Sequence, residues 1–326
     1  MEKVLVTGAG GFIGSHLVEE LVKKGNSVRA FIKYNSRNYW GNLELLDKEI
    51  RDNLEVISGD ITDPFYIDKA VKGVDTVFHL AALIAIPYSY HAPENFVRVN
   101  VNGTLNILQA CLRHDVKRLI HTSTSEVYGT ALYVPIDEKH PLQAQSPYSA
   151  TKISADKIVE SFYLTYNLPT VIIRPFNTFG PRQSARAVIP TIISQALSKT
   201  PVIRIGSSDP IRDFTFVKDT IGGFIKGTVS NDAVGKVINL GTGSGISIGD
   251  LVSLIMKCTN ITKEIKVDEE RIRPSNSEVM KLICDNSMAK KILKWEPEYT
   301  LEKGLEETIG FIKEHLSQYK TNLYNI

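Results

Sequence analysis

Two short stretches of the chain carry side chains that can move protons at a carbonyl or hydroxyl group. Thr124 and Glu126 follow a short apolar run, and Tyr148 precedes Lys152 by four residues. Four residues make about one turn of an α-helix, so a helix over this stretch places the tyrosine and the lysine on one face. A tyrosine has an ordinary pKa of about 10, and a nearby positive charge lowers that pKa. The spacing therefore predicts Tyr148 as an acid–base group, with Thr124 as a second hydrogen-bonding partner for the same substrate oxygen.

A glycine-rich turn near the start of the chain predicts a dinucleotide site. Gly8, Gly11 and Gly14 are three residues apart, between a short apolar strand and an amphipathic helix, and Phe12 and Ile13 between them are also expected to bind the cofactor. The glycines of such a turn let the backbone bend sharply and approach a pyrophosphate, and the helix N-terminus favours the anion. Beside an acid–base tyrosine, a nicotinamide cofactor implies hydride transfer coupled to proton transfer. The lysine of the pair can also hold the ribose of the nicotinamide.

Residues after the next strands predict the rest of the cofactor site. Lys33 and Arg37 follow a strand expected over Ser27–Ile32, at the point where a carboxylate commonly binds the ribose 2′-hydroxyl of NAD. Cations suit a 2′-phosphate better, so the sequence favours NADP over NAD; the alternative is that both are solvated surface charges. The groups expected around the adenine and along the cofactor are Asp60, Ile61, Leu80, Ala81 and Ala82.

The periodicity of the chain predicts its fold class. Strand and helix patterns alternate six times up to about residue 178, which is typical of a parallel sheet with helices on both faces. We expect an α/β fold, a Rossmann-type doubly wound parallel sheet with a smaller C-terminal α/β substrate domain. The dinucleotide-binding domain is expected over 1–178, with 213–243 returning to it, and the second domain over 179–212 and 244–326. We also expect a single strand over Arg212–Val217 and one long helix from Pro93 to about His114.

Composition argues against several classes of protein. The formal net charge is +2 without a run of like charge, which gives no support for a nucleic-acid or membrane-surface partner. The three cysteines are far apart, as expected for reduced thiols of a cytoplasmic protein. No stretch approaches the roughly 18 apolar residues of a membrane span. His79 lies in an apolar strand and is expected in the core, and no metal site is expected.

These motifs resemble the extended short-chain dehydrogenase/reductase superfamily, which includes nucleotide-sugar epimerases and dehydratases. The resemblance extends over nearly the whole chain and rests on TGAGGFIG at the start, HLAA around Leu80, YSATK from Tyr148, RPFNTFGPRQ from Arg174, RDFTFVKD from Arg212 and RIRPSNSEV near the end. It implies a Rossmann-type fold, a bound NAD or NADP and a nucleotide-diphosphate sugar as the substrate. It also implies a homodimer formed through a four-helix bundle of the helices after Pro93 and Pro147.

The carboxylate of Glu126 indicates which reaction to expect. When C4 of a sugar is a ketone, the C5 proton is acidic, so a carboxylate can remove it and the C6 hydroxyl can leave as water. Within the resemblance, dTDP-glucose 4,6-dehydratases carry Thr-Asp-Glu here, whereas this chain has Thr124-Ser125-Glu126 and is similar to the GDP-mannose 4,6-dehydratases. This difference leaves open whether Ser125, Glu126 or a water is the acid for the leaving hydroxyl. A carboxylate that only caps the loop is the other interpretation.

The whole chain most resembles the 4,6-dehydratases of legionaminic acid biosynthesis, which the resemblance links to GDP-N-acetylglucosamine. We therefore expect a 4,6-dehydratase, a lyase, that acts on GDP- or UDP-N-acetylglucosamine. Arginines suit a diphosphate because they form charge-assisted hydrogen bonds. The residues that the resemblance places around the substrate are Ile84, Tyr88, Asn177, Arg182, Arg186, Arg212 and Arg273.

The sequence leaves three alternatives open. UDP-glucuronate decarboxylases also carry Thr-Ser-Glu, and Arg273 could hold the carboxylate of their substrate. A nucleotide-sugar 4-epimerase would keep Tyr148, Lys152 and the cofactor. A regulatory protein that binds NADP without turnover is the non-enzymatic alternative, and the intact Thr124, Tyr148 and Lys152 argue against it.

Overall fold

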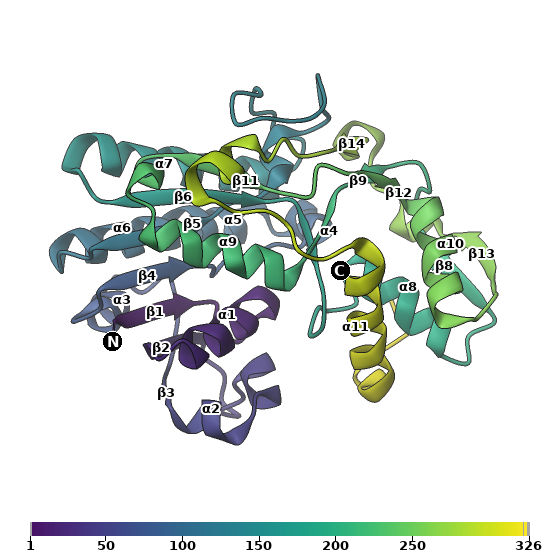
Figure 1. Cartoon of the computed structure of the whole chain (residues 1–326), viewed down its shortest axis with the longest axis horizontal. Helices are drawn as coiled ribbons and strands as arrows, with labels where there is room; N and C mark the ends of the chain where they lie inside the picture. Colours follow the sequence, from purple (N-terminus) through teal and green to yellow (C-terminus); the bar gives the residue numbers. More distant parts are fainter. Residues whose placement is uncertain (1, 322, 325–326) are drawn as a thin grey trace.

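A seven-stranded parallel sheet forms the centre of the molecule (Figure 1). The computed structural model describes residues 2–321, 323 and 324. From one edge to the other the strands are β11 (Val237–Leu240), β6 (Thr170–Pro175), β5 (Arg118–Thr122), β4 (Thr76–His79), β1 (Lys3–Thr7), β2 (Ser27–Lys33) and β3 (Leu54–Gly59). Neighbouring strands are parallel throughout this sheet, so each connection must cross over one of its faces.

Helices cover both faces of the sheet because successive strand residues point to opposite sides. Val4 and Val6 pack into one apolar cluster with α1 and α9, whereas Leu5 packs into a second cluster with α3, α6 and α7. The helices along the sheet are α1 (Phe12–Lys23), α2 (Lys48–Asp52), α3 (Pro64–Val71), α6 (Gly103–Arg113), α7 (Pro147–Tyr166) and α9 (Val217–Val229). The predicted doubly wound α/β fold is confirmed.

Small sheets and further helices lie beside the carboxyl ends of the central strands, on the right of Figure 1. The strand pairs are β7 (Asn177–Phe179) with β10 (Phe214–Phe216) and β8 (Val202–Ile205) with β13 (Glu264–Val267). A third small sheet places β9 (Ile211–Arg212) between β12 (Ile246–Ser247) and β14 (Lys281–Leu282). The helices of this part are α8 (Val188–Leu197), α10 (Ile248–Thr259) and α11 (Leu301–Glu314).

The prediction of one strand over Arg212–Val217 is wrong, because the chain breaks at Asp213. β9 ends before this residue and β10 begins after it, and the two strands belong to different sheets. The carboxylate of Asp213 is buried and accepts hydrogen bonds from the backbone N–H groups of Thr242 (2.9 Å), Gly243 (2.8 Å) and Cys284 (3.1 Å). These three hydrogen bonds hold Asp213 in place, so the chain passes from one small sheet to the other at this residue.

The long helix predicted to begin at Pro93 contains a π-helical segment, which the sequence did not indicate. Its parts are α5 (Pro93–Phe96), the π-helical η2 (Val97–Asn102) and α6, and α4 (Ile86–His91) precedes them. Within η2, the buried Asn100 amide accepts from Leu83 N (2.8 Å) and donates to Leu83 O (3.0 Å) and to Thr151 Oγ1 (3.0 Å). The π-helical turn therefore lies where the Asn100 side chain joins the loop after β4 to α7. Turns of this kind commonly occur beside functional sites.

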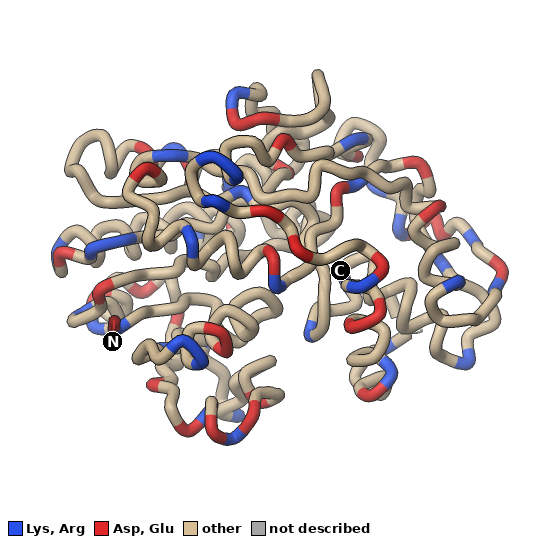
Figure 2. The backbone as a smooth tube through the Cα atoms, in the orientation of Figure 1, with Lys and Arg blue, Asp and Glu red and all other residues tan. Residues whose placement is uncertain are grey.

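Acidic and basic residues are interspersed along the described backbone (Figure 2). This distribution matches the formal net charge of +2 and the absence of long runs of like charge in the sequence. Among the helices in the described ranges, none is a candidate membrane span.

Candidate active site

A cavity of about 980 Å³ lies at the carboxyl ends of the central strands, where they meet the small sheets. Ligands of such folds bind at this edge, at the point where the strand order reverses, and here that point lies between β1 and β4. The predicted site residues that line the cavity are Gly8, Gly11, Phe12, Ile13, Gly14, Lys33, Asp60, Ile61, Leu80, Ala81, Ala82, Ile84, Thr124, Ser125, Glu126, Tyr148, Lys152, Asn177, Arg182, Arg186, Arg212 and Arg273. The fold thus gathers residues from distant parts of the chain into one site.

The turn between β1 and α1 forms a cradle for an anion. Gly8 has φ +70°, and a Cβ atom on it would lie 2.9 Å from the backbone nitrogen of Ala81. Gly11 is the N-cap of α1 and offers no side chain to cap the helix, so the first N–H groups of α1 have no side-chain cap. Those N–H groups and the helix dipole favour a phosphate at this point. The residues present therefore fit the pyrophosphate of a dinucleotide.

Of the residues predicted around the adenosine part of the cofactor, Lys33, Asp60 and Ile61 line the cavity and Arg37 does not. Lys33 lines the cavity at the end of β2, and Asp60 accepts hydrogen bonds from the backbone N–H and the hydroxyl of Thr62, both at 2.8 Å. The backbone hydrogen bond from Thr62 is the main cause that lowers the pKa of Asp60, and the charge of Lys33 adds to it. Arg37 is exposed and does not line the cavity, since the chain has turned away from the sheet there.

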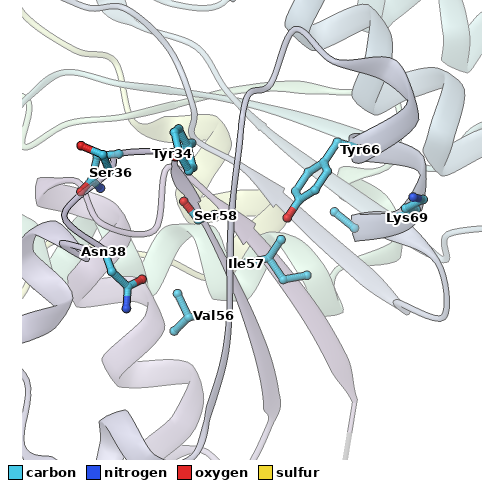
Figure 3. A pocket seen from close by; sticks show the side chains of 10 residues that line it. Tyr34, Ser36, Asn38, Val56, Ile57, Ser58, Tyr66 and Lys69 are labelled. Carbon is cyan, nitrogen blue, oxygen red and sulfur yellow. The ribbon is translucent and has the colours of Figure 1, made fainter.

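A second, smaller cavity borders the loop after β2 (Figure 3). It has a volume of about 530 Å³ and is lined by residues of this loop, of β3 and of α3, among them Tyr34, Asn38, Ser58, Tyr66 and Lys69. None of the predicted catalytic or cofactor-binding residues lines it. The predicted catalytic and cofactor-binding residues that line a cavity therefore gather in the larger of the two.

The predicted catalytic pair lies at the start of α7. Ser146 caps this helix by accepting a hydrogen bond from Ser149 N (3.1 Å), and the Ser149 hydroxyl accepts one from Ser146 N (3.1 Å). Tyr148 and Lys152 are nearly buried, with exposed fractions of 6% and 4%. Lys152 Nζ donates to the carbonyl oxygen of Thr122 at 2.7 Å. The end of β5 and the first turns of α7 thus hold both side chains in place.

Burial controls the proton affinities of this pair. Burial raises the pKa of Tyr148, and a hydrogen bond with the Thr124 hydroxyl lowers it in part. The lowered value that the sequence led us to expect is therefore not present in the protein alone; it requires the positive charge that an oxidised nicotinamide brings. Burial lowers the pKa of Lys152 to about 8, although the charge of Asp156 raises it.

Ser125 and Glu126 begin a 3-10 turn, η3 (Ser125–Tyr128), directly after β5. The hydroxyl of Thr124 caps this turn by accepting from Glu126 N at 3.2 Å. The carboxylate of Glu126 is close enough to raise the pKa of Tyr148 through its charge. Ser125 is buried, with an exposed fraction of 3%. A carboxylate, two hydroxyls and the tyrosine therefore share one wall of the cavity.

The arginines expected at the diphosphate are paired with a carboxylate that the sequence did not single out. Arg212 Nη2 lies 3.1 Å from Glu278 Oε1, and Arg273 Nη1 lies 3.7 Å from the same oxygen. Burial lowers the pKa of Arg212, and the charges of Glu126 and Glu278 raise it. The buried Oδ1 of Asn177 has no hydrogen-bond partner among the described residues. This end of the cavity therefore offers cations and an unpaired polar atom to a ligand.

Of the remaining residues predicted to bind the substrate, three line the cavity and Tyr88 does not. Arg182 lines the cavity but donates to Glu19 Oε2 of α1 at 2.6 Å, so it also joins the turn after β7 to α1. Arg186 and Ile84 are exposed at the cavity. Tyr88 lies outside the lining, with its ring 5.9 Å from that of Phe96. α4 thus presents other residues to the cavity than the sequence suggested.

Sequence reasoning missed several polar residues around the site. Asn100, Asp156, Arg174 and Glu278 all make buried or partly buried hydrogen bonds with the segments that carry the predicted catalytic and substrate residues. Asp156 carries a signal that could have found it, because it follows Lys152 by four residues and so continues the same face of α7. The partners of the other three come from distant segments, which no local spacing encodes.

The fold and the site define an extended short-chain dehydrogenase/reductase, with a dinucleotide cradle beside a tyrosine–lysine pair. The chain belongs to the GDP-mannose 4,6-dehydratase family, because the sequence model of that family matches residues 5–308. Curated relatives include dTDP-glucose 4,6-dehydratases and UDP-glucose 4-epimerases, and solved neighbours include a UDP-glucuronic acid 4-epimerase and a dTDP-glucose 4,6-dehydratase, each in complex with NAD.

Individual relatives match over nearly their whole length. The low-salt glycan biosynthesis protein Agl12 of Haloferax volcanii is 32% identical over 310 residues, which cover 94% of this chain and 97% of that protein. The dTDP-D-glucose 4,6-dehydratase of Homo sapiens is 31% identical over 98% of this chain and 92% of its own. Among solved structures, a variant of the UDP-glucuronic acid 4-epimerase from Bacillus cereus, in complex with UDP-4-deoxy-4-fluoro-glucuronic acid and NAD, matches with a TM-score of 0.88 at 29% identity. That match covers 96% of this chain and 99% of the epimerase.

Proposed function

We propose that the protein is a nucleotide-sugar 4,6-dehydratase with a tightly bound nicotinamide cofactor. The observation that carries this proposal is the position of Glu126, which shares a cavity with Thr124, Tyr148 and Lys152 and acts through its charge on Tyr148. A 4-epimerase needs the tyrosine and the lysine, but it needs no carboxylate at this point. Removal of a C5 proton does need one, and a carboxylate beside the acid–base tyrosine is placed for it.

The residues of the site then divide the proton transfers among them. When bound, the nicotinamide supplies a hydride acceptor for C4 and a hydride donor for C6. Tyr148 takes the proton of the C4 hydroxyl, Thr124 hydrogen-bonds the same oxygen, and the charge of Lys152 favours the phenolate. Glu126 takes the C5 proton, and the C6 hydroxyl leaves as water after it receives a proton from Ser125, Glu126 or a water. C6 then receives the hydride and C5 receives a proton from Tyr148 or Glu126, so the product is a 4-keto-6-deoxy sugar.

The substrate that we propose is GDP- or UDP-N-acetylglucosamine, in the biosynthesis of legionaminic acid. Arg212, Arg273 and Asn177 would hold the diphosphate and ribose, supported by their common position at one end of the cavity. Binding of a diphosphate there would take over the role of Glu278, which faces both arginines in the free protein. The apolar loop around Ile84 would face the sugar. The sequence resemblance supports the choice of sugar.

We propose NADP as the cofactor, with Lys33 beside its 2′-phosphate. Lys33 lines the cavity, whereas Arg37 does not, so one of the two cations that favoured NADP supports the proposal. NAD is the alternative, since solved dehydratase and epimerase neighbours hold NAD. Mass analysis of the cofactor released from the purified protein tests this choice. NAD as the released compound would remove the role given to Lys33.

We also propose that residues 1–178 and 213–243 form the dinucleotide-binding domain and the remainder the nucleotide-sugar domain. Two contacts support this division: β11 pairs with β6, and α9 packs against β5 and β6. The assembly that we propose is a cytoplasmic homodimer through a four-helix bundle. α6 and α7 contact each other and expose Leu112 and Leu164, which supports an apolar contact between subunits.

The reaction is tested by incubating the purified protein with GDP- and UDP-linked hexoses and taking mass spectra of the products. Loss of one water from the sugar is expected. Loss of carbon dioxide would instead indicate the decarboxylase, and an unchanged mass with a new sugar configuration would indicate the epimerase. The epimerase is the second candidate because solved 4-epimerases match the whole chain.

The Glu126→Gln variant separates elimination from oxidation. We expect this variant to reduce its cofactor on addition of substrate, since Tyr148 and Lys152 remain, but to release water at least about a hundredfold more slowly. Absorbance of the reduced nicotinamide and the product mass measure the two steps independently. Unchanged water loss would remove Glu126 from the mechanism.

A further inference from the structure

A group of buried polar side chains lies directly beneath the candidate active site and takes no part in the steps described above. Its centre is Asp156, which has an exposed fraction of 1%. Tyr148, Lys152 and Asp156 follow one another at intervals of four residues along α7, so they continue one face of the helix. The catalytic pair is therefore followed, one turn further into the protein, by a carboxylate.

Asp156 binds the segment between β5 and η3, directly before the proposed catalytic hydroxyls. Its Oδ2 atom accepts a hydrogen bond from the Ser123 hydroxyl at 2.8 Å. Ser123 directly precedes Thr124 and connects β5 to η3, the turn that begins with Ser125 and Glu126. Through this one bond, α7 fixes the position at which the catalytic turn leaves the sheet.

The same carboxylate oxygen is held from a second strand. Arg174 of β6 donates to it through Nε (3.0 Å) and Nη2 (2.9 Å). Arg174 also donates to the hydroxyl of Tyr128 at 2.9 Å, and that hydroxyl donates to Asn239 of β11 at 2.7 Å. The position of Asp156 is thus set by hydrogen bonds that reach three adjacent strands of the sheet.

Asp156 lies one helical turn from Lys152 on α7, and its negative charge raises the pKa of that lysine against the effect of burial. The titratable and charged groups around Lys152 are Tyr148 and Asp156 on α7, His121 and His79 on β5 and β4, Arg174 on β6 and Glu126 on η3. Burial lowers the pKa values of both histidines, so they are neutral near pH 7 and do not stabilise a cation. His121, Arg174 and Lys152 lower the pKa of Asp156 against the effect of its burial, so it is ionised.

We propose that Asp156 is a positioning residue of the active site: its carboxylate fixes the turn that carries Thr124 and Glu126 and keeps the buried Lys152 protonated. This inference rests on the role given to Lys152 in the proposed function. The competing explanation is that Asp156 and Arg174 form a buried ion pair that only stabilises the fold. A buried pair of that kind would be costly to break and would leave the titration of Lys152 unchanged.

The test compares Asp156→Asn with a double variant and a matched control, each with its cofactor as purified. The double variant, Asp156→Asn with Arg174→Gln, removes both charges of the pair, so it answers the question even where the single variant does not fold. The control is Asp219→Asn, which neutralises another buried carboxylate that accepts backbone hydrogen bonds far from Lys152 (from Glu298 N at 2.9 Å and Tyr299 N at 3.2 Å).

Two readouts follow Lys152 itself and the step that it supports. The first is the 13Cε chemical shift of Lys152 against pH, assigned with Lys152→Arg, which reports protonation without any turnover. The second is the pH dependence of cofactor reduction in a single turnover. We expect Lys152 to titrate about one pH unit lower in both Asp156 variants, and the alkaline limb of the reduction rate to move by the same amount. The control should show neither change.

Unchanged titration of Lys152 in a folded Asp156 variant would overturn the inference, as would a loss of rate that is equal at all pH values. The outcome is independent of the reaction finally catalysed. A wild-type protein that reduces its cofactor but releases no water would refute the dehydratase, while the titration of Lys152 would still decide the role of Asp156.

Discussion

At the scale of single residues, Tyr148 depends on neighbours from other elements. Its burial raises the pKa of the hydroxyl, the Thr124 hydroxyl lowers it, and the charge of Glu126 raises it again. The protein without its cofactor therefore holds the tyrosine in the neutral form. The charge of the oxidised nicotinamide is what would make the phenolate accessible, so catalytic competence and cofactor binding are coupled at this residue.

Replacement of Tyr148 by Phe removes the hydroxyl that we propose as the proton acceptor and leaves the aromatic ring in place. We expect the rate of cofactor reduction to fall about a thousandfold, with unchanged affinity for the nucleotide sugar, because the arginines of the diphosphate end are untouched. Stopped-flow absorbance and equilibrium titration measure these two quantities. Tyr133→Phe is the matched control, since Tyr133 is exposed and, among the residues that the structure describes, its hydroxyl donates to Asp137 alone. A Tyr148→Phe enzyme of normal rate would assign the proton transfer to another group.

The sequence predicted these residues because their relations are local. The distance from Tyr148 to Lys152 is one helical turn, and Thr124 to Glu126 follow the end of one strand, so spacing alone placed them together. The pairing of Asp156 with Arg174 depends on how α7 packs on β6, which no spacing encodes. Arg37 and Tyr88 do not line the cavity for a related reason: the path of a loop or a short helix decides which of its side chains reach the cavity, and spacing along the chain does not encode that path.

At the scale of elements, the turn from β1 into α1 is the most constrained part of the cofactor site. A Cβ atom on Gly14 would lie 2.2 Å from the carbonyl oxygen of Gly8 and 3.0 Å from the Cα atom of Ala9. Both contacts are with backbone, which cannot move aside without opening the turn. The close packing of α1 on β1 and the cradle for the pyrophosphate therefore depend on the same glycine.

Gly14→Ala should consequently lower both stability and cofactor content. We expect the free energy of unfolding to fall by about 2 to 3 kcal/mol, a typical cost of overpacking, with loss of the bound cofactor. Gly310→Ala is the control, because Gly310 lies in α11 with open space around it, and alanine there should stabilise by about 0.5 to 1 kcal/mol. Urea unfolding measures the free energy of unfolding, and absorbance of the purified protein measures its cofactor content. Equal effects of the two substitutions would contradict the steric argument.

The regular elements were largely predictable, and the exceptions have physical causes. α7 (Pro147–Tyr166) has the helical periodicity of its sequence, and in the structure Ser146 caps its start. The break at Asp213 and the π-helical turn around Asn100 were not predicted. In both cases a buried polar side chain binds the backbone of a distant segment, and that tertiary contact overrides the local pattern.

At the scale of the whole molecule, His16 joins α1 to the turn that leads into the smaller sheets. Its Nε2 atom lies 2.9 Å from the carbonyl oxygen of Pro181. Burial, with the charge of Arg182, lowers the pKa of His16 from 6.5 to about 4. The folded protein thus binds this proton less readily than the unfolded chain. The stability from this group is complete above pH 6.5 and is lost as the pH falls through 6.5 toward 4.

This linkage can be measured with His16→Gln, which keeps a polar side chain that cannot titrate. Between pH 6.5 and 4, the wild type should lose up to about 3 kcal/mol more unfolding free energy than the variant. The measurement is urea unfolding at a series of pH values. The slope of unfolding free energy against pH gives the number of protons taken up on unfolding, and the difference between the two proteins is the share of His16. Parallel curves for the two proteins would show that His16 does not titrate on unfolding.

The proposed homodimer makes a prediction about the outer faces of α6 and α7. Leu164 has an exposed fraction of 72% and Leu112 one of 36%. Leu164→Glu should place a charge in an apolar interface and convert a dimer to a monomer, as measured by light scattering after size exclusion. Val229→Glu is the control, since Val229 is also exposed (78%) but belongs to α9. Dissociation by both variants or by neither would refute this interface.

The order of the strands has a consequence for how the protein is made. β11 completes the edge of the sheet beside β6, yet the ribosome produces β7, α8, β8, β9, β10 and α9 between the two strands. Throughout that interval the nascent chain exposes the unpaired backbone of β6 as a sheet edge, which is a template for wrong pairing. A truncated chain that ends before Val237 should therefore aggregate more readily than the full chain.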